Sequence, residues 1–187
     1  MNKFLLTFAG VILLVFPSVT SADIVFNGGF ETGDFTGWIL SGNPIPGNVD
    51  MSAPHSGMYA ANLSAAGSLG YMDQFLPTNA GALYNLTFYL ESDGGTPNEF
   101  LAQVAGTTLF QELNIPAQSY ALYSFFFQAT TASTDLKFGF RNDPGFFHLD
   151  DISVTAVPEP ASVWLGSVLT AVAIITQLAR RSRRDFR

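Results

Sequence analysis

Two adjacent carboxylates are the most chemically suggestive residues of this chain. Asp150 and Asp151 lie in a strand-like run whose apolar positions change parity. Phe147 and Leu149 occupy odd positions, whereas Ile152 and Val154 occupy even positions, so the two pairs would point to opposite faces of a regular strand. A β-bulge at Asp150-Asp151 reconciles the two phases, because a bulge inserts one extra residue into a strand. Neighbouring carboxylates at a bulge predict a cation site.

Aromatic rings with outward parity point to a second chemistry, the stacking of sugars. The candidates are Tyr71, Tyr89, Tyr123 and Arg141, with Asn85 and Gln103 as polar helpers. Packing against the core is the competing interpretation for each ring. The abundance of Phe, with 18 residues, favours core packing, because Phe fills a core more often than it forms a sugar platform. Trp38 follows a glycine and is assigned to the core.

No residue set points to catalysis, and we expect a protein that is not an enzyme. His55 and His148 are the only histidines, and the absence of cysteine excludes thiolate chemistry and disulfides. Ser56 is adjacent to His55, but sequence neighbours in a strand or turn rarely aim at each other. Hydrolase, metalloprotease and P-loop motifs are absent. A carboxylate pair for glycoside hydrolysis remains open, but none is marked out.

Short alternating runs separated by Gly, Pro, Asn, Asp and Ser must position these residues. They predict an all-β domain, an antiparallel β-sandwich of the jelly-roll type. The run at 120–129 has aromatics on both faces, as expected of a central strand covered on both sides. The expected strands are 24–30, 37–40, 58–63, 69–75, 83–91, 99–104, 107–112, 120–129, 135–141 and 147–155.

Both ends of the chain read as membrane-directed segments rather than fold elements. Residues 1–22 form a signal peptide, with Lys3 before an apolar run and small residues ahead of cleavage after Ala22. Residues 161–178 are uncharged and mostly apolar, about 27 Å as a helix, which predicts a transmembrane helix near 161–179. A buried helix of a soluble domain is the alternative. The transmembrane interpretation is favoured by a cluster of arginines directly after the apolar run, namely Arg180, Arg181, Arg183 and Arg184.

The body between these segments is a single acidic domain, residues 23–156. From 23 to 157 it holds thirteen acids but only Lys137 and Arg141 as bases, a net charge near −11. Such a charge repels nucleic acid, so we expect no nucleic-acid partner. Divalent cations or neutral glycans suit it better. Acids that simply keep an exported protein soluble are the alternative.

Three segments of the body resemble jelly-roll carbohydrate-binding modules and the wider galactose-binding-like domains. They are Asn27-Gly28-Gly29-Phe30-Glu31 with Gly37-Trp38, then Pro54-His55-Ser56-Gly57-Met58-Tyr59, and finally Phe147-His148-Leu149-Asp150-Asp151-Ile152. The resemblance implies that the first and last strands lie together with a structural calcium ion near them. Its implied ligands are Glu31 and Asp151, joined by oxygens of Asn27, Gly29, Ser52, Gly57 or Asp150. The alternative is that Glu31 and Asp151 only bond backbone amides.

The C-terminal segment, residues 157–187, resembles the PEP-CTERM sorting signal of exported bacterial proteins. Pro158-Glu159-Pro160 precedes the apolar run and the arginine cluster. The resemblance implies an exosortase as partner, anchoring in the inner membrane with the domain outside the cytoplasm, and then release or attachment at the cell surface. It also implies an extracellular-matrix role that includes exopolysaccharide or other glycan binding. The alternative is a structural or adhesive surface protein with no small ligand.

Overall fold

The computed structural model describes residues 21–42 and 47–158 of the chain. The predicted signal peptide, apart from its last two residues, and the segment from Glu159 onward lie outside the described residues. Within the described ranges, no helix is long and apolar enough to span a membrane.

Ten strands make up the described part of the chain. They are β1 (Ile39–Gly42), β2 (Asn48–Asp50), β3 (Ala60–Leu63), β4 (Gly70–Pro77), β5 (Leu83–Ser92), β6 (Asn98–Val104), β7 (Thr107–Leu113), β8 (Gln118–Gln128), β9 (Ser133–Asn142) and β10 (Phe147–Ala156). Eight of the runs expected from sequence therefore overlap closely with observed strands. β2 was not expected, because three residues are too few to show alternation.

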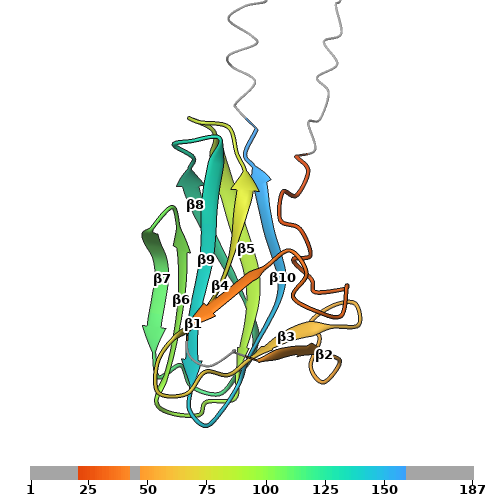
Figure 1. Cartoon of the computed structure of the whole chain (residues 1–187), viewed down its shortest axis with the longest axis vertical. Coiled ribbons are helices and arrows are strands. Elements are labelled where there is room, and N and C mark those ends of the chain that lie inside the picture. The colour runs from red at the N-terminus through yellow and green to blue at the C-terminus, as the bar shows by residue number, and fades with distance from the viewer. Residues whose placement is uncertain (1–20, 43–46, 159–187) are drawn as a thin grey trace, which may run out of the picture.

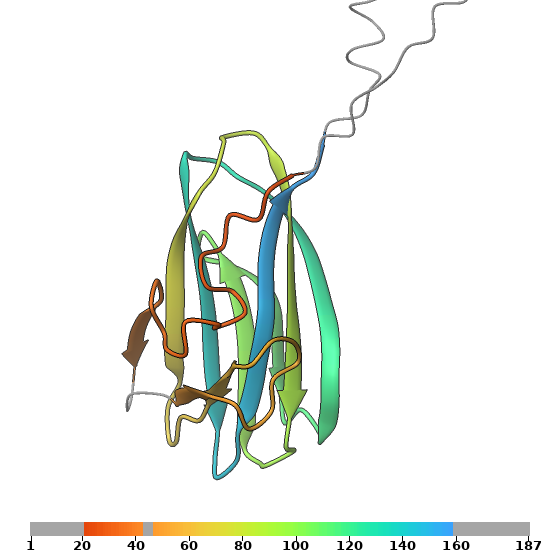
Figure 2. The ribbon, with the colours of Figure 1, turned by 90° about the vertical axis from the view of Figure 1, so that its right-hand side faces the viewer.

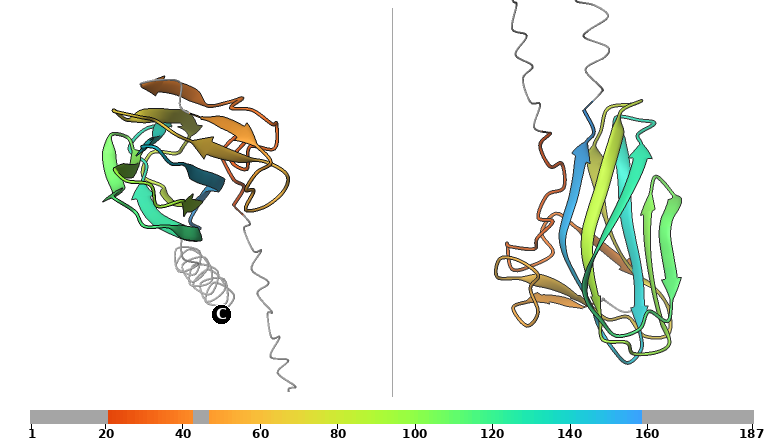
Figure 3. Two further views of the ribbon diagram at one scale, coloured as in Figure 1. Left: turned by 90° about the horizontal axis from the view of Figure 1, so that it is seen from below. Right: turned by 180° about the vertical axis from the view of Figure 1, so that it is seen from behind.

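The strands form two five-stranded sheets packed as a sandwich, which confirms the predicted fold class (Figure 1). Sheet A has the order β2-β3-β10-β5-β8, and sheet B has the order β1-β4-β9-β6-β7. All paired strands in both sheets are antiparallel. β2, β3 and the loop between them lie to one side of the sandwich (Figure 3).

Phenylalanine fills the space between the sheets. The rings of Phe88, Phe100 and Phe138 are fully buried and contact one another, with centroids 5.2–5.9 Å apart. Trp38 is 7% exposed and packs against Phe30 and Phe138, which confirms its assignment to the core. Among the described residues, every fully buried hydrophobic side chain lies between residues 30 and 154. A chain of residues 23–158 therefore contains the whole core, and we expect it to fold alone.

The expected strand at 24–30 is wrong. Apart from one bridge between Asp23 and Thr155, this segment runs as turns, with Asn27 and Phe30 in the left-handed region at φ 53° and 56°. It nevertheless lies against the last strand, since Ile152 N donates to Gly28 O at 3.0 Å. Figure 2 shows the segment (red) beside β10 (blue). The two ends of the domain meet as the family resemblance implies.

The bulge predicted in the last strand is confirmed, because the pairing of β10 with β5 shifts register between Asp150 and Ser153. The central position predicted for 120–129 is wrong. β8 is an edge strand of sheet A, and Phe126 on its outer face is 63% exposed.

Candidate functional site

The four residues predicted to bind sugars do not share one surface. Tyr71 and Arg141 lie on β4 and β9, on the outer face of sheet B. Tyr89 lies on the outer face of sheet A, and Tyr123 faces the core. We define the outer face of sheet B around Tyr71, Asp73, Lys137, Gly139 and Arg141 as the sheet B face.

A tyrosine ring lies over a glycine at the centre of this face. Tyr71 and Leu101 are both register partners of Gly139, one on each side of it. A Cβ atom added at Gly139 would lie 2.9 Å from Tyr71 Cε1 and 2.9 Å from Leu101 Cγ. Because Gly139 has no side chain, the Tyr71 ring can lie close to its backbone. Leu101, which is 6% exposed, approaches Gly139 from the other side. The arrangement is an aromatic platform on an open sheet face.

Charged groups flank the ring and are more buried than an outer face would suggest. Asp73 is only 8% exposed and has Lys137 as its register partner. Burial raises the pKa of the Asp73 carboxyl, Lys137 lowers it in part, and nearby Asp135 raises it further. A carboxyl with a perturbed pKa on an outer sheet face is a candidate functional group.

Two polar atoms of this face are buried without a hydrogen-bond partner among the described residues, namely Arg141 Nε and Asp135 Oδ1. Arg141 also makes a distant ion pair with Asp143, at 3.9 Å. A buried donor or acceptor left unpaired costs about 1–3 kcal/mol, so a ligand that pairs with it gains affinity. The sheet B face thus combines a stacking ring with free donors and acceptors, the combination that sugar hydroxyls require.

The other two predicted tyrosines are occupied by protein contacts. The Tyr89 ring is stacked on His55, with centroids 3.6 Å apart. The outward parity predicted for Tyr123 is wrong, because its ring stacks on the core residue Phe88 at 5.2 Å. Of the predicted helpers, Asn85 bonds Ser124 on sheet A, whereas Gln103 lies on β6 of sheet B and bonds Thr108.

Some of the predicted calcium ligands come together near the bulge. Asp150 is fully buried and accepts hydrogen bonds from the backbone N–H groups of His55, Ser56 and Asp151. Asp151 accepts from Ser56 Oγ at 2.7 Å and lies 2.6 Å from His55 Nδ1. Glu31 Oε1 accepts from the N–H groups of Met58 and Tyr59. The loop between β2 and β3 is therefore held on three carboxylates.

Glycines leave space around these acids. Cβ atoms added at Gly29 would lie 3.6 Å from Asp151 Oδ1 and 3.7 Å from Asp150 Oδ1, and one at Gly57 would collide with Glu31 Oε1. Asn27 is placed differently: its side-chain amide bonds Asp34 O, Thr36 O and Thr32 N and so shapes its own loop. Ser52 donates to Asp50, which is not one of the three carboxylates that hold the loop.

The chemistry of this cluster fits a hard cation only in combination with other oxygens. Its donors are carboxylates, which calcium prefers, and burial raises the pKa of Asp150, with the charge of Asp151 adding to the effect. Within residues 21–42 and 47–158, however, no three acidic or histidine side chains are placed to hold a metal by themselves. Calcium here would have to draw on backbone carbonyls and water.

Asp73, Lys137 and Gly139 of the sheet B face were not predicted as site residues. Their outward parity on β4 and β9 was visible. What the sequence did not show is that β4 and β9, which are far apart in the chain, are neighbours in the sheet.

The fold matches known carbohydrate-binding modules, although no family model matches the chain and no curated protein matches it either. TmCBM61 in complex with β-1,4-galactotriose superposes with a TM-score of 0.63 at 20% identity, over 73% of this chain and 100% of that one. The CBM22-1 xylan-binding domain of Xyn10C from Paenibacillus barcinonensis gives 0.54 at 13% identity, over 77% and 100%. The K3 cleaved adhesin domain of Lys-gingipain from Porphyromonas gingivalis gives 0.51 at 17%, over 73% and 99%. At these identities the likeness establishes a shared jelly-roll fold.

Proposed function

We propose that this chain is a non-catalytic glycan-binding protein whose ligand lies on the sheet B face. The observation that carries the proposal is the Tyr71 ring seated over Gly139, with the buried Asp73 and the half-buried Lys137 and Arg141 around it. Two buried polar atoms nearby have no hydrogen-bond partner among the described residues. The shared fold with modules that bind galactotriose and xylan supports it. The net charge near −11 of the body favours a neutral glycan over an anionic one.

Affinity gel electrophoresis of residues 23–158 tests whether any glycan is bound. Gels containing β-1,4-galactan, xylan or purified exopolysaccharide should retard the domain relative to gels without polysaccharide. Equal migration in all gels would contradict glycan binding and would favour a structural or adhesive surface protein.

We further propose that the protein is exported and sorted by an exosortase. The support is the sequence at the two ends of the chain, in particular Pro158-Glu159-Pro160 followed by an uncharged run and four arginines. After processing, the domain would sit at the cell surface or in an exopolysaccharide matrix, where a glycan-binding face has a use.

Replacing Pro158, Glu159 and Pro160 together by alanine is expected to block processing, because a sorting enzyme recognises this element. Immunoblots of cell fractions should show the unprocessed chain accumulating in the inner membrane. A variant with three alanines at Thr107, Thr108 and Gln111, on the exposed edge strand β7, is the control and should be sorted normally. Unchanged processing and location of the first variant would refute the sorting proposal.

A structural calcium ion is the second proposal, and the adjacent carboxylates of Asp150 and Asp151 at the bulge favour it, because calcium prefers oxygen ligands of this kind. Carboxylate oxygens of Glu31, Asp150 or Asp151, completed by backbone carbonyls and water, would hold the ion, and calcium would reduce the repulsion between the two adjacent aspartates. Calcium should therefore raise the thermal unfolding midpoint. The expected gain is about 1.4 kcal/mol when free calcium is about ten times its dissociation constant.

Differential scanning calorimetry of residues 23–158 in calcium and in a chelator measures this effect. Magnesium at the same concentration is the control and should give a smaller shift, because it resists exchanging its water ligands. Identical midpoints in calcium and chelator would refute the calcium site and leave the glycan proposal untouched.

A further inference from the structure

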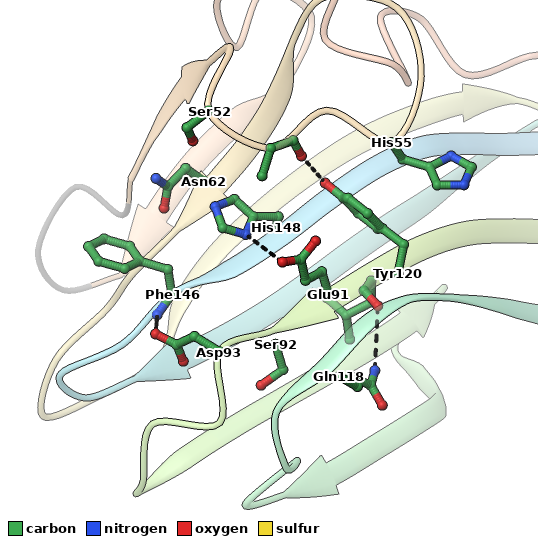
Figure 4. Close-up of polar contacts among 12 residues, drawn as sticks. Ser52, His55, Asn62, Glu91, Ser92, Asp93, Gln118, Tyr120, Phe146 and His148 are labelled. Carbon is green, nitrogen blue, oxygen red and sulfur yellow. Dashed lines mark hydrogen bonds and ion pairs between the residues drawn. The ribbon is translucent and has the colours of Figure 1, made fainter.

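Three polar side chains form a row across the outer face of sheet A. Asn62 on β3 is the register partner of His148 on β10, and His148 is the register partner of Glu91 on β5. Neighbouring strands lie about 4.8 Å apart, so successive side chains of the row are near neighbours. Figure 4 shows the three following one another across the strands, with Tyr120 beyond Glu91. We call Asn62, His148 and Glu91 the sheet A row.

The row contains polar atoms with nothing to bond. Asn62 Oδ1 and His148 Nδ1 are both buried and have no hydrogen-bond partner within the described part of the chain. Glu91 Oε1 is 3.9 Å from His148 Nδ1, which is beyond hydrogen-bond reach. Buried polar atoms are nearly always paired in folded proteins, so two unpaired atoms on adjacent strands need an explanation. A ligand that pairs with both provides one.

The surroundings of the row are held in place. Asn62 Nδ2 donates to Asp50 Oδ2 at 3.3 Å, which leaves Oδ1 free. Burial alone would raise the pKa of Asp50, but hydrogen bonds from Ser52, Asn62 and Asn48 outweigh it and lower the pKa to about 2. Asp50 is therefore ionised at neutral pH and keeps the Asn62 amide oriented.

Tyr120 forms the other boundary. Its hydroxyl donates to Ala53 O at 2.6 Å, and its ring packs edge-on against His55 at 5.1 Å. Burial raises the pKa of the Tyr120 hydroxyl far above its usual range, and nearby carboxylates, Asp150 and Glu91 first among them, add to the effect. Tyr120 therefore stays neutral and offers a fixed aromatic surface next to Glu91.

The free atoms select the ligand by their chemistry. Asn62 Oδ1 and the Glu91 carboxylate accept hydrogen bonds, and His148 Nδ1 can either donate or accept. The charges of Glu91 and Asp50 oppose an anion. A metal ion would find only two of its preferred side chains here, His148 and Glu91. A sugar ring carries adjacent hydroxyl groups, which supply several donors and acceptors on one rigid, uncharged frame. The apolar face of the sugar matches the aromatic surface of Tyr120.

We propose that the sheet A row is a second carbohydrate site, on the opposite sheet from Tyr71. The inference does not depend on the sheet B face binding a glycan, because it rests on separate unpaired atoms. With both sites filled, one domain would connect two glycan strands, and multivalent contact of this kind strengthens retention in a polysaccharide matrix.

The test is an NMR titration of ¹⁵N-labelled residues 23–158 with galactose, glucose and xylose. Concentrations up to about 100 mM would nearly saturate a site with a millimolar dissociation constant. The amide signals of Asn62, His148 and Glu91 should shift with at least one sugar. Asn62→Ala and Glu91→Gln should each weaken this response about tenfold or more. Ser153→Ala, on the outer face of β10 but outside the row, should leave it unchanged, as should Tyr71→Ala.

Thermal melts of each variant separate lost binding from lost folding. Glu91→Gln keeps the size of the side chain but removes its charge and one of its two acceptor oxygens. No shift at the three residues with any of the sugars would overturn the inference. A response to Zn²⁺ at these residues, with silence toward sugars, would also overturn it. Shifts at Tyr71, Gly139 and Arg141 report on the sheet B face separately, so the two proposals can fail independently.

Discussion

Replacing Asp150 by alanine is expected to lower the free energy of unfolding by about 3–4 kcal/mol. The carboxylate is fully buried and accepts the backbone N–H groups of His55, Ser56 and Asp151. Its loss removes three charge-assisted hydrogen bonds at once and releases the β2–β3 loop from β10. Because hydrogen bonds to charged groups contribute about 1.5–3 kcal/mol each, even partial rehydration of the amides leaves a large deficit.

Urea unfolding of residues 23–158, followed by fluorescence, measures the loss. Asp150→Asn keeps one carbonyl oxygen as an acceptor and should fall between the wild type and Asp150→Ala. Glu112→Ala is the matched control, since this acid is exposed on the edge strand β7 and should change stability by no more than about 0.5 kcal/mol. If Asp150→Ala loses less than about 1 kcal/mol, the carboxylate does not hold the loop as described.

Replacing Tyr71 by alanine is expected to weaken glycan binding at least about 30-fold, equivalent to about 2 kcal/mol or more. The ring is the aromatic group at the centre of the described sheet B face, over Gly139, and its removal takes away the stacking surface. Isothermal titration calorimetry, with an oligosaccharide of whichever polysaccharide retards the domain, gives the dissociation constants.

Two variants separate the ring from other effects of the Tyr71 substitution. Tyr71→Phe keeps the stacking surface and should bind within about threefold of the wild type. Tyr89→Ala removes the same side chain from the other sheet, where His55 covers the ring, and should leave this affinity unchanged. Equal losses for Tyr71→Ala and Tyr89→Ala would show that binding does not depend on the sheet B face.

Alternation in the sequence predicted most strands, because inward apolar residues recur every second position along most of β5 and β9. It failed where another constraint dominates. In the segment 24–30, the left-handed Asn27 and Phe30 bend the chain into turns. In β8, aromatics on both faces suggested a central strand. The inner rings instead close the edge of the core against Phe110 of β7, and the outer Phe126 stays exposed.

The binding surfaces were only partly predictable for a different reason. Parity assigns a side chain to one face of its strand, but it does not say which sheet the strand joins. Tyr71 and Tyr89 therefore looked equivalent until the strand order separated them. The sheet A row depends on which strands pair and on their exact register. Alternation fixes which face a side chain lies on, but it does not say which distant strand lies beside it.

Mapping the bound glycan by amide chemical shifts tests the central claim most directly. Residues 23–158 would be titrated with an oligosaccharide of a polysaccharide that the domain binds. Glycan binding on the sheet B face predicts that the largest shifts occur at Tyr71, Asp73, Lys137, Gly139 and Arg141, and that they vanish in Tyr71→Ala while its thermal melt stays cooperative. A saturable response that leaves these five residues unmoved would contradict the claim.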